Sequence, residues 1–322
     1  MRDESAAPGY CVGIVSYRSY DDLARCLESI ANQKLRPEGV HVLDADADPS
    51  HHQALIERFP WLSVEDSPNR GYAGGANRVL SWVIENHPDT DFCLLLNPDV
   101  VLEPEFADRL TRAVSERAGV ALATGKLLRP DGRTIDSAGI DLPRHRRPRD
   151  RGSEQTDHGQ HDEPGDVFGA SGAAMLIRMS ALPDLSLAGE IFDEDFFVYH
   201  EDTDLCWRAQ RLGWRVHYEP SARAAHTRGW RRGDRFGVAT SIRRHSFKNH
   251  YLQLIKNESR SDLARGLPVL LAWEGLRLGY ALLRDPAVLP AYAAAFRLSG
   301  KAFHKRRLLR EKLQNKVPGP PS

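Results

Sequence analysis

The chain has 322 residues, of which 41% are hydrophobic and 27% are charged, a composition that is ordinary for a folded globular protein. Its 44 Lys and Arg residues balance its 44 Asp and Glu residues, which excludes the global basic field of nucleic-acid-binding proteins. We therefore expect no nucleic-acid partner, and the length suits one large α/β domain with an appended helical region.

Short apolar runs alternate with helical patterns through the first half of the chain. Between the first two runs, Leu23, Cys26, Leu27 and Ile30 recur at the spacing of one helical face. This alternation predicts an α/β fold with a mostly parallel sheet covered by helices, in which ligands bind outside the carboxyl ends of the strands. The predicted strands are residues 12–15, 40–43, 62–65, 92–96, 120–124 and 215–218.

The chain divides into regions of different composition. Residues 143–164 are rich in Arg, Asp, His, Gly and Pro, which predicts a flexible surface insertion that adds little to the core. From about Val238 the pattern becomes helical, and the chain ends in Pro-Gly-Pro-Pro-Ser. We therefore predict a catalytic domain over residues 1–237, a C-terminal helical region over 238–316 and a disordered tail over 317–322.

Three features predict a cytoplasmic protein. The first nine residues lack the apolar core of a secretory signal. The run Leu267–Leu283 is interrupted by Glu274 and Arg277, so it does not match a membrane span. The cysteines are far apart in apolar surroundings, which indicates buried free thiols in a reducing compartment; they are Cys11, Cys26, Cys93 and Cys206.

The first candidate site is Asn97-Pro98-Asp99, directly after the most apolar strand. A carboxylate there would project into the ligand crevice, and a divalent cation on a diphosphate needs only one or two protein carboxylates. Asp99 suits this role. The alternative is an Asn-Pro-Asp turn ahead of the helix that begins near Pro104.

The second candidate is Phe192–Asp204, where six carboxylates are interleaved with aromatic residues ahead of a helix that begins near Asp202. A solvated acidic loop would not normally contain so many aromatic side chains. The dipole of the helix would keep a carboxylate at its N-terminus ionised, as a general base requires. We predict that Asp202 is the base, with its neighbour Glu201 as the second choice.

Two further segments are candidates for binding the ligand. His226 precedes a stretch rich in Gly, Trp and Arg that suits a lid over phosphates, and imidazole beside a carboxylate can hold manganese. A histidine at a strand end can equally be a core or capping residue. The glycine-rich segment 69–77 would bring backbone N–H groups near a ligand, or form only a tight turn between strand and helix.

In this order and spacing, the motifs resemble those of glycosyltransferase family 2, which has the GT-A fold. Within the family the chain looks most like the bacterial rhamnosyltransferase-like branch, which builds cell-envelope polysaccharides. The matching segments are Gly13–Tyr17, Asn69–Asn77, Leu94–Asp99, Gly169–Ala173, Phe192–Phe197, Glu201–Leu205, Gly213–Val216 and His226.

The resemblance implies an inverting, metal-dependent hexosyltransferase with Mg²⁺ or Mn²⁺ as cofactor. Its partners would be a nucleotide-diphosphate sugar and a glycan or lipid-linked acceptor. Rhamnose is one candidate for the transferred sugar. Asp99 would match the second acid of the metal-binding D-x-D motif, His226 the later metal ligand, and Asp202 the base of the E-D motif. The residues expected at the nucleotide sugar are Ser16, Tyr17, Asp44, Asn69, Arg70, Gly71, Gly75 and Asn97.

Two departures from the family pattern leave the donor nucleotide open. Asn97 replaces the first acid of D-x-D, and after the second strand the usual Val-Asp-Asn-x-Ser is replaced by Leu43-Asp44-Ala45-Asp46-Ala47. A catalytically inactive sugar-nucleotide or carbohydrate-binding protein is the first alternative, but it would be expected to lose Asp99, Asp202 or His226. A sugar nucleotidyltransferase is the second, but it would be expected to have a glycine-rich loop with Arg and Lys after the first strand.

The C-terminal region has two interpretations. Leu267–Leu283 and Ala291–Phe296 are apolar, and a basic run follows from Arg297 to Lys316. Apolar helical faces beside a cationic segment suit peripheral contact with an anionic membrane, at its cytoplasmic face. Alternatively, these helices pack on the catalytic domain or form a homodimer contact, with the basic run solvated.

Overall fold

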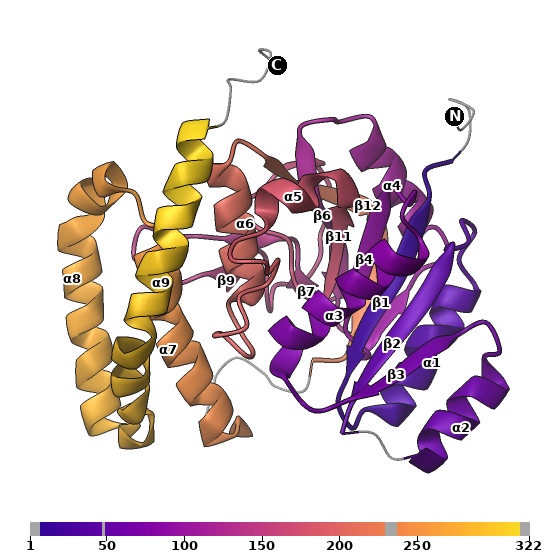
Figure 1. Cartoon of the computed structure of the whole chain (residues 1–322), viewed down its shortest axis with the longest axis horizontal. Helices are drawn as coiled ribbons and strands as arrows, with labels where there is room; N and C mark the ends of the chain where they lie inside the picture. The colour runs from indigo at the N-terminus through magenta and orange to yellow at the C-terminus, as the bar shows by residue number, and fades with distance from the viewer. Residues whose placement is uncertain (1–6, 47–48, 229–236, 316–322) are drawn as a thin grey trace.

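The computed structural model describes residues 7–46, 49–228 and 237–315, which form a central sheet covered by helices, with a group of helices at one end (Figure 1). The main sheet has ten strands in the order β10-β12-β6-β11-β4-β1-β2-β3, with β5 paired to β12 and β7 to β6, while β8 and β9 pair separately. The strands are β1 (Tyr10–Ser16), β2 (Gly39–Ala45), β3 (Ser63–Ser67), β4 (Phe92–Leu96), β5 (Val100–Leu102), β6 (Val120–Leu128), β7 (Ile135–Ser137), β8 (Ile140–Asp141), β9 (Arg149–Asp150), β10 (Gly165–Asp166), β11 (Ala174–Arg178) and β12 (Arg215–His226).

The sheet is mostly parallel, as predicted. Strands β3, β2, β1 and β4 run parallel to one another, and β6 runs parallel to β12. The exception at the centre is β11, which lies between β4 and β6 and is antiparallel to both. The alternation of strands and helices did not predict β11. It belongs to no strand–helix unit, since the short apolar run Ala174–Ile177 follows a Gly- and Ala-rich loop.

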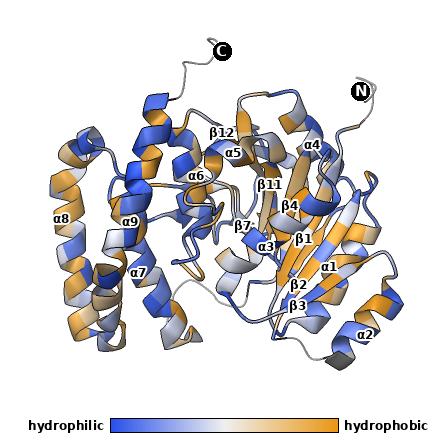
Figure 2. Ribbon diagram, viewed as in Figure 1, coloured by the Kyte–Doolittle hydropathy of each residue, from blue (hydrophilic) through white to orange (hydrophobic). Residues whose placement is uncertain are grey.

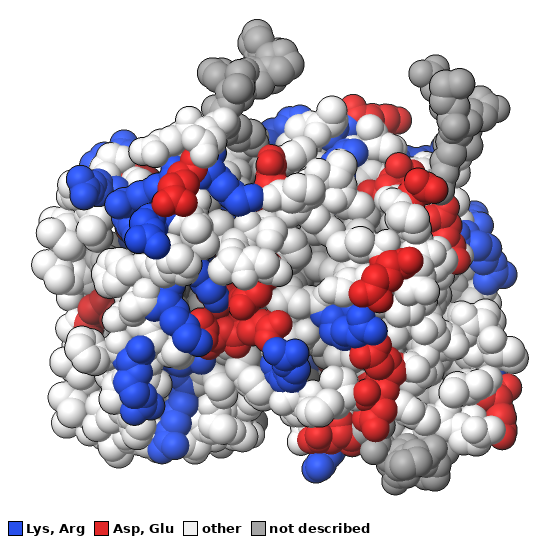
Figure 3. Space-filling view, in the orientation of Figure 1, with Lys and Arg blue, Asp and Glu red and all other residues white. Residues whose placement is uncertain are grey.

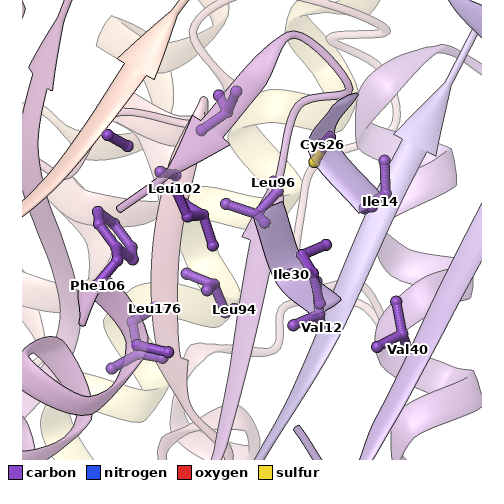
Figure 4. Close-up of a cluster of buried hydrophobic side chains, with 14 of the residues drawn as sticks. Val12, Ile14, Cys26, Ile30, Val40, Leu94, Leu96, Leu102, Phe106 and Leu176 are labelled. Carbon is purple, nitrogen blue, oxygen red and sulfur yellow. The ribbon is translucent and has the colours of Figure 1, made fainter. Parts of the chain in front are cut away.

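The sheet separates two layers of buried side chains, because successive residues of a strand point to opposite faces. Leu94 and Leu96 of β4 pack in one cluster, which Figure 4 shows together with Cys26 and Ile30 of helix α1 (Tyr20–Ala31). Leu95 packs in the cluster on the other face. Burial of both faces explains why β4 is an uninterrupted apolar run.

Three long helices make up the C-terminal region. Helix α7 packs on α9, and α8 lies at the outer edge of the molecule, furthest from the sheet (Figure 1). The helical prediction for this region is therefore confirmed. With α1, the α-helices are α2 (Pro49–Arg58), α3 (Gly71–Asn86), α4 (Phe106–Ser115), α5 (Leu182–Leu185), α6 (Glu201–Arg211), α7 (Thr240–Asn257), α8 (Arg260–Leu283) and α9 (Pro290–Asn315).

Residues 143–164 form no helix, but they are not merely a surface loop. They contribute Asp157, whose carboxylate lies 3.0 Å from the amino group of the fully buried Lys126, and Asp162, which pairs with the same amino group. The ring of His145 stacks on Trp273 of α8 with the centroids 4.4 Å apart. The expectation that this insertion adds little to the core is therefore corrected, because a buried lysine needs its carboxylates.

Two simpler expectations can be compared with the structure. The four cysteines are free and buried, as predicted. Within residues 7–46, 49–228 and 237–315, none of the helices combines the length and hydropathy that a membrane span requires. The predicted tail, 317–322, lies outside the described residues.

Candidate active site

The predicted site residues come from segments that follow the carboxyl ends of neighbouring strands. Ser16 and Asp44 end β1 and β2 in register with each other, and Asn97 and Asp99 follow β4. Strand β12 ends at His226. The sequence-predicted residues therefore gather at one edge of the sheet, the edge at which ligands bind in parallel sheets.

Asp99 and His226 are brought together by an antiparallel pairing. The register of β5 and β12 sets His226 opposite Val100, so that the Nε2 atom of His226 lies 3.3 Å from Oδ1 of Asp99. The backbone N–H of Thr227 donates to the carbonyl oxygen of Asp99 at 2.9 Å, which holds the turn in place. The tertiary structure thus joins the two residues that the sequence proposed as metal ligands.

The other ring nitrogen of His226 has a buried carboxylate partner. Nδ1 lies 2.6 Å from Oδ2 of Asp136, which belongs to β7 and is fully buried. Burial alone would lower the pKa of His226, but hydrogen bonds to Asp136 and Asp99 outweigh it and raise this pKa to about 9. The ring is therefore protonated at neutral pH, with Nδ1–H directed to Asp136 and Nε2–H to Asp99.

This arrangement fits a divalent cation. A ligating histidine commonly donates its second N–H to a carboxylate, which fixes the ring and directs the other nitrogen at the metal. Asp136 does this for His226, and the nitrogen that faces Asp99 would exchange its proton for the cation. One imidazole nitrogen and one carboxylate are a donor set that manganese accepts, and a cation on a diphosphate takes its remaining ligands from phosphate and water.

Asp136 was missed by sequence reasoning. It lies in a three-residue strand, and Arg129 and Arg228 contribute nitrogens 3.1 and 3.3 Å from its Oδ1. Burial alone would raise the pKa of Asp136, but its hydrogen bond with His226 and the two arginines lower it, so the carboxylate stays ionised. The signal in the sequence was weak, a single acid in the short segment Ile-Asp-Ser-Ala at residues 135–138.

Arg228 connects the cation site to the predicted base. Its Nη2 donates to Oδ2 of Asp150 at 2.8 Å, and the charge of Asp150 in turn acts on Asp202. Asp202 lies at the start of α6, where its Oδ2 accepts from the N–H of Gly172 at 3.1 Å and its Oδ1 from the N–H of Thr203 at 2.6 Å. The two proposed centres are therefore parts of one polar network.

The protonation of the E-D pair differs from expectation. The N-terminus of α6 was expected to keep Asp202 fully ionised, but burial raises its pKa in spite of the hydrogen bonds from Gly172 and Thr203. The pKa of Glu201 is raised well above its ordinary value, first by burial and then by the charge of Asp202. A raised pKa makes Asp202 a stronger base, and the larger rise at Glu201 favours its neutral form.

The loop before α6 has an unusual backbone. Phe197, Tyr199 and His200 all have φ angles between 67° and 70°, in the left-handed region that costs a non-glycine residue about 1–2 kcal/mol. The side-chain amide of Asn249, on α7, lies 2.7–2.9 Å from the carbonyl oxygens of Phe196, Val198 and Tyr199. One buried amide of the C-terminal region therefore supports the loop that presents Glu201 and Asp202.

Other acids of the Phe192–Asp204 stretch pair with lysines of the C-terminal helices. Lys256 of α7 lies 2.6 Å from Asp193 and 2.7 Å from Asp204. Lys305 of α9 lies 2.5 Å from Asp193 and 3.3 Å from Asp195. Acidic and basic side chains accordingly gather side by side on the face shown in Figure 3. The density of acids in this stretch thus has a structural cause as well as a catalytic one.

Two buried polar side chains lie where the nucleotide is expected. Ser16 and Asp44 are fully buried, and among the described residues neither the Ser16 hydroxyl nor the Asp44 carboxylate has a hydrogen-bond partner. The ring of His52 is 3.3 Å from Asp44, and burial raises the pKa of this carboxyl. Buried polar atoms of this kind suit a ligand that supplies the missing hydrogen bonds. Tyr17, the next residue, is half-exposed.

The glycine-rich segment has a clear packing role. Gly71 has a φ of +72°, and a Cβ there would lie 2.3 Å from the carbonyl oxygen of Phe197. A Cβ on Gly75 would lie 2.6 Å from Val15. Asn69 accepts from the N–H of Gly71 at 2.9 Å, and Arg70 donates to Glu194 at 2.8 Å. The glycines are explained by close contact of α3 with its neighbours, and nucleotide contacts of this segment stay a prediction.

Not every predicted feature can be placed. The lid predicted after His226 falls largely on residues 229–236, which lie outside the described residues. Asn97 is half-buried at the end of β4, and its backbone N–H donates to the carbonyl oxygen of Ala173 at 2.9 Å. Its side chain makes no hydrogen bond recorded for the described residues, so its role at the ligand stays a prediction.

Comparison with known proteins places this geometry in context. A family described as "Glycosyltransferase like family 2" matches residues 8–247. N-acetylglucosaminyl-diphospho-decaprenol L-rhamnosyltransferase of Mycobacterium tuberculosis is 31% identical over 239 residues, which cover 66% of this chain and 74% of that protein. Rhamnosyltransferase WbbL of Escherichia coli is 28% identical over 231 residues, which cover 66% and 81%.

Solved structures show the same fold at low sequence identity. GalNAc-T7 with UDP, GalNAc and Mn²⁺ superposes with a TM-score of 0.58 at 13% identity, over 79% of this chain but only 48% of that one. The mannosyltransferase PcManGT from Pyrobaculum calidifontis, in complex with GDP-Man and Mn²⁺, gives a TM-score of 0.53 at 19% identity, over 93% and 77%. Together these neighbours have the GT-A fold that the sequence predicted.

Proposed function

This chain belongs to glycosyltransferase family 2, and we propose that it transfers a rhamnosyl group from a nucleotide-diphosphate donor to a hydroxyl of a lipid-linked glycan acceptor, with inversion at the anomeric carbon. The observation that carries the proposal is the chain of polar contacts that runs from Asp99 through His226, Asp136 and Arg228 to Asp150, whose charge acts on Asp202. The named relatives, two rhamnosyltransferases, support the choice of sugar.

The donor diphosphate would bind beside Asp99 and His226 together with a divalent cation. Mn²⁺ in two structural neighbours supports a metal of this kind. Such a cation would neutralise the charge that develops on the leaving diphosphate. Asp136 orients the imidazole for it, and Arg228 and Arg129 keep Asp136 ionised.

Asp202 would accept the proton of the acceptor hydroxyl. Its two hydrogen bonds hold the carboxylate in one orientation, and its raised pKa increases its affinity for the proton. The hydroxyl oxygen then attacks the anomeric carbon on the face opposite to the leaving diphosphate, which inverts the configuration. Burial and the charge of Asp202 raise the pKa of the neighbouring Glu201, which favours a single negative charge on the pair.

The nucleotide would bind at Ser16 and Asp44. The carboxylate of Asp44 can accept an N–H of the base or a hydroxyl of the ribose, and either bond would satisfy its buried oxygens. The lipid-linked acceptor is inferred from the M. tuberculosis relative, whose name specifies a diphospho-decaprenol. Such an acceptor would place the reaction at the cytoplasmic face of a membrane.

The test is a transfer and donor-hydrolysis assay over a panel of nucleotide sugars, with and without Mn²⁺. Asp99→Ala should abolish turnover and the metal-dependent part of donor binding in calorimetry, because it removes one of two protein ligands. Asp108→Ala, which removes an acid of the α4 surface that pairs with Arg112, is the matched control. Full activity of Asp99→Ala, undiminished wild-type activity in EDTA, or donor binding without any turnover would overturn the proposal.

A further inference from the structure

The outward face of α8 contains no charged side chain between Arg265 and Arg284. The helix has two charged residues in that interval, and both face the protein: Glu274 accepts from His250 at 2.8 Å, and the guanidinium of Arg277 lies 4.1 Å above the ring of Phe247. The sequence pattern alone made these two residues look like interruptions of an apolar run. The structure shows that they leave the opposite face uniformly apolar.

That face is exposed in the described structure. Leu283 is 84% exposed, Leu276 69% and Leu271 62%. Figure 2 shows α8 as a largely hydrophobic helix at the outer edge of the molecule. A surface helix of a globular protein normally exposes polar side chains to water, whereas α8 exposes apolar ones. The exposed apolar residues are Leu263, Leu267, Val269, Leu271, Leu276, Leu278, Leu282 and Leu283.

Helix α9 behaves differently, and this separates the two interpretations of the C-terminal region. Ala291, Ala302 and Leu309 of α9 are buried. Lys305 pairs with Glu190 and Asp193, and Lys301 pairs with Asp195. The packing interpretation therefore holds for the buried side of α9, and much of the basic run is used inside the molecule, although Phe296 and Phe303 stay exposed. The membrane interpretation is left to α8.

A cluster of arginines lies at the N-terminal end of α8. Arg211, Arg260, Arg306 and Arg310 line one cavity of about 320 Å³ with Ser259. Arg211 and Arg306 each donate to a carbonyl oxygen at the end of α7, that of Asn257 at 2.9 Å and that of Ile255 at 2.5 Å. Basic side chains gather over the upper ends of α8 and α9 in Figure 3.

The nearby carboxylates do not neutralise this cavity. Glu258 is held by Arg146, with 2.6 Å between Oε2 and Nε, and Asp262 is paired with Arg265 and with the hydroxyl of Ser259. Four guanidinium groups thus face one space with their local acids engaged elsewhere. Guanidinium groups gathered in this way match the oxygens of a phosphate group.

We propose that α8 docks the enzyme on an anionic phospholipid bilayer. Its leucine face enters the acyl-chain boundary, and the arginine cavity binds the phosphate of a lipid headgroup. The occupant is argued from charge complementarity, since the apolar face ends in Arg265 on one side and Arg284 on the other. With 24 residues, α8 is about 36 Å long and would lie in the interface plane, consistent with the absence of a spanning helix among the described residues.

This inference deepens the proposed function, because a docked enzyme would meet a lipid-linked acceptor at the bilayer surface. The biological role of docking rests on the proposed function, but the docking itself does not. Binding to lipid can be measured without donor or acceptor, so failure of the docking surface and failure of the transferase activity give separate results.

The experiment is sedimentation of the full chain with vesicles of phosphatidylcholine, with and without phosphatidylglycerol, at low and high salt. The wild-type protein should bind the anionic vesicles, and high salt should weaken this binding. Leu271→Ser/Leu276→Ser/Leu283→Ser should lower the partition coefficient by at least about tenfold, because three exposed apolar side chains no longer enter the bilayer. Ile84→Ser, an exposed apolar residue of α3, should bind as the wild type does.

A separate pair of variants tests the arginine cavity. Arg260→Glu/Arg310→Glu should lose the preference for anionic vesicles, while Arg25→Glu, on α1 at the other end of the molecule, should keep it (Figure 1). Inorganic phosphate should compete only weakly, since it lacks the acyl chains that anchor the helix.

Several outcomes would overturn the proposal. A wild-type protein that ignores anionic vesicles at low salt is one, and leucine variants that bind them as tightly as the wild type are another. A third is a stable dimer that the leucine variants dissociate, in a chain without affinity for vesicles, because α8 would then be the contact with a second copy.

Discussion

Replacing Asn249 tests whether the C-terminal helices take part in catalysis through the backbone of one loop. Asn249 is fully buried, and its two amide hydrogens are shared among three carbonyl oxygens of residues 196–199. Asn249→Leu keeps a side chain of similar size but removes every donor. The loop that contains the left-handed residues Phe197, Tyr199 and His200 would then lose three of its backbone contacts.

The expected magnitude follows from these contacts. Two to three hydrogen bonds contribute about 1 kcal/mol each, so the free energy of unfolding should fall by about 2–3 kcal/mol. Each left-handed residue stores about 1–2 kcal/mol that the loop can release by relaxing. Relaxation would shift Glu201 and Asp202, and a displacement of about 1 Å at a catalytic group costs about a hundredfold in rate.

The assay separates turnover from binding and from stability. For Asn249→Leu, kcat of sugar transfer should fall by about a hundredfold, while the calorimetric Kd for the donor changes little, since Ser16 and Asp44, at which the nucleotide is proposed to bind, lie on β1 and β2. The matched control is Gln253→Leu, one turn further along α7. Gln253 is buried, and its amide has no hydrogen-bond partner among the described residues, so this change should be neutral or stabilising. If Asn249→Leu retained kcat within about threefold of the wild type, the loop would not need this support.

Three further predictions concern the base, the insertion and acid stability. Asp202→Asn should lose turnover by several orders of magnitude yet bind the donor, whereas Glu201→Gln, which imitates the neutral acid, should stay active in the same assay; the reverse order would exchange their roles. Shortening residues 143–164 should lower the free energy of unfolding by about 3 kcal/mol in urea titrations, because buried Lys126 loses Asp157 and Asp162. Adding Lys126→Met to the same deletion should make the loss smaller, which would confirm the cause. A negligible effect of the deletion alone would contradict it. Burial lowers the pKa of His41 and His250 to about 4 and that of His200 to about 3. As the pH falls below about 6.5, these histidines therefore bind protons in the unfolded chain but not in the folded chain. Between about pH 7.5 and 5.5 these three histidines should lower the free energy of unfolding by about 4 kcal/mol, while His226, whose pKa is raised to about 9, should raise it by about 1 kcal/mol. These four histidines together should therefore lower the free energy of unfolding by about 3 kcal/mol in EDTA. A free energy of unfolding that stays level over this range would show that the three rings are not held neutral.

Much of the fold was readable from local patterns. The predicted strands and the helices that begin near Asp202 and Thr240 are present because apolar periodicity records which face of an element is buried. The order of motifs also identified the family, and Asp99 and His226 were named as partners before any contact was known.

Other features of the fold and of the site could not be predicted from local sequence patterns. Strand β11 is central, but its five residues carry no periodic signal, and only a short 3-10 helix and the four-residue α5 follow it. The acids of Phe192–Asp204 look alike in sequence, yet Asp193 and Asp204 pair with Lys256 while Asp202 faces Gly172. Only the positions of α7 and α9 distinguish the structural acids from the proposed base.

The sequence by itself thus determined the α/β architecture, the family and the chemical types of side chain at the site, because these depend on periodicity and on residues close together along the chain. The tertiary structure decided which groups act on one another. Asp136 reaches His226 through the pairing of β7 with β6, Asn249 reaches its loop from α7, and α8 keeps a row of exposed leucines while α9 is largely packed on its neighbours. Contacts between residues so far apart depend on how the elements pack, and a pKa or an exposed surface depends on those contacts and not on the order of the residues.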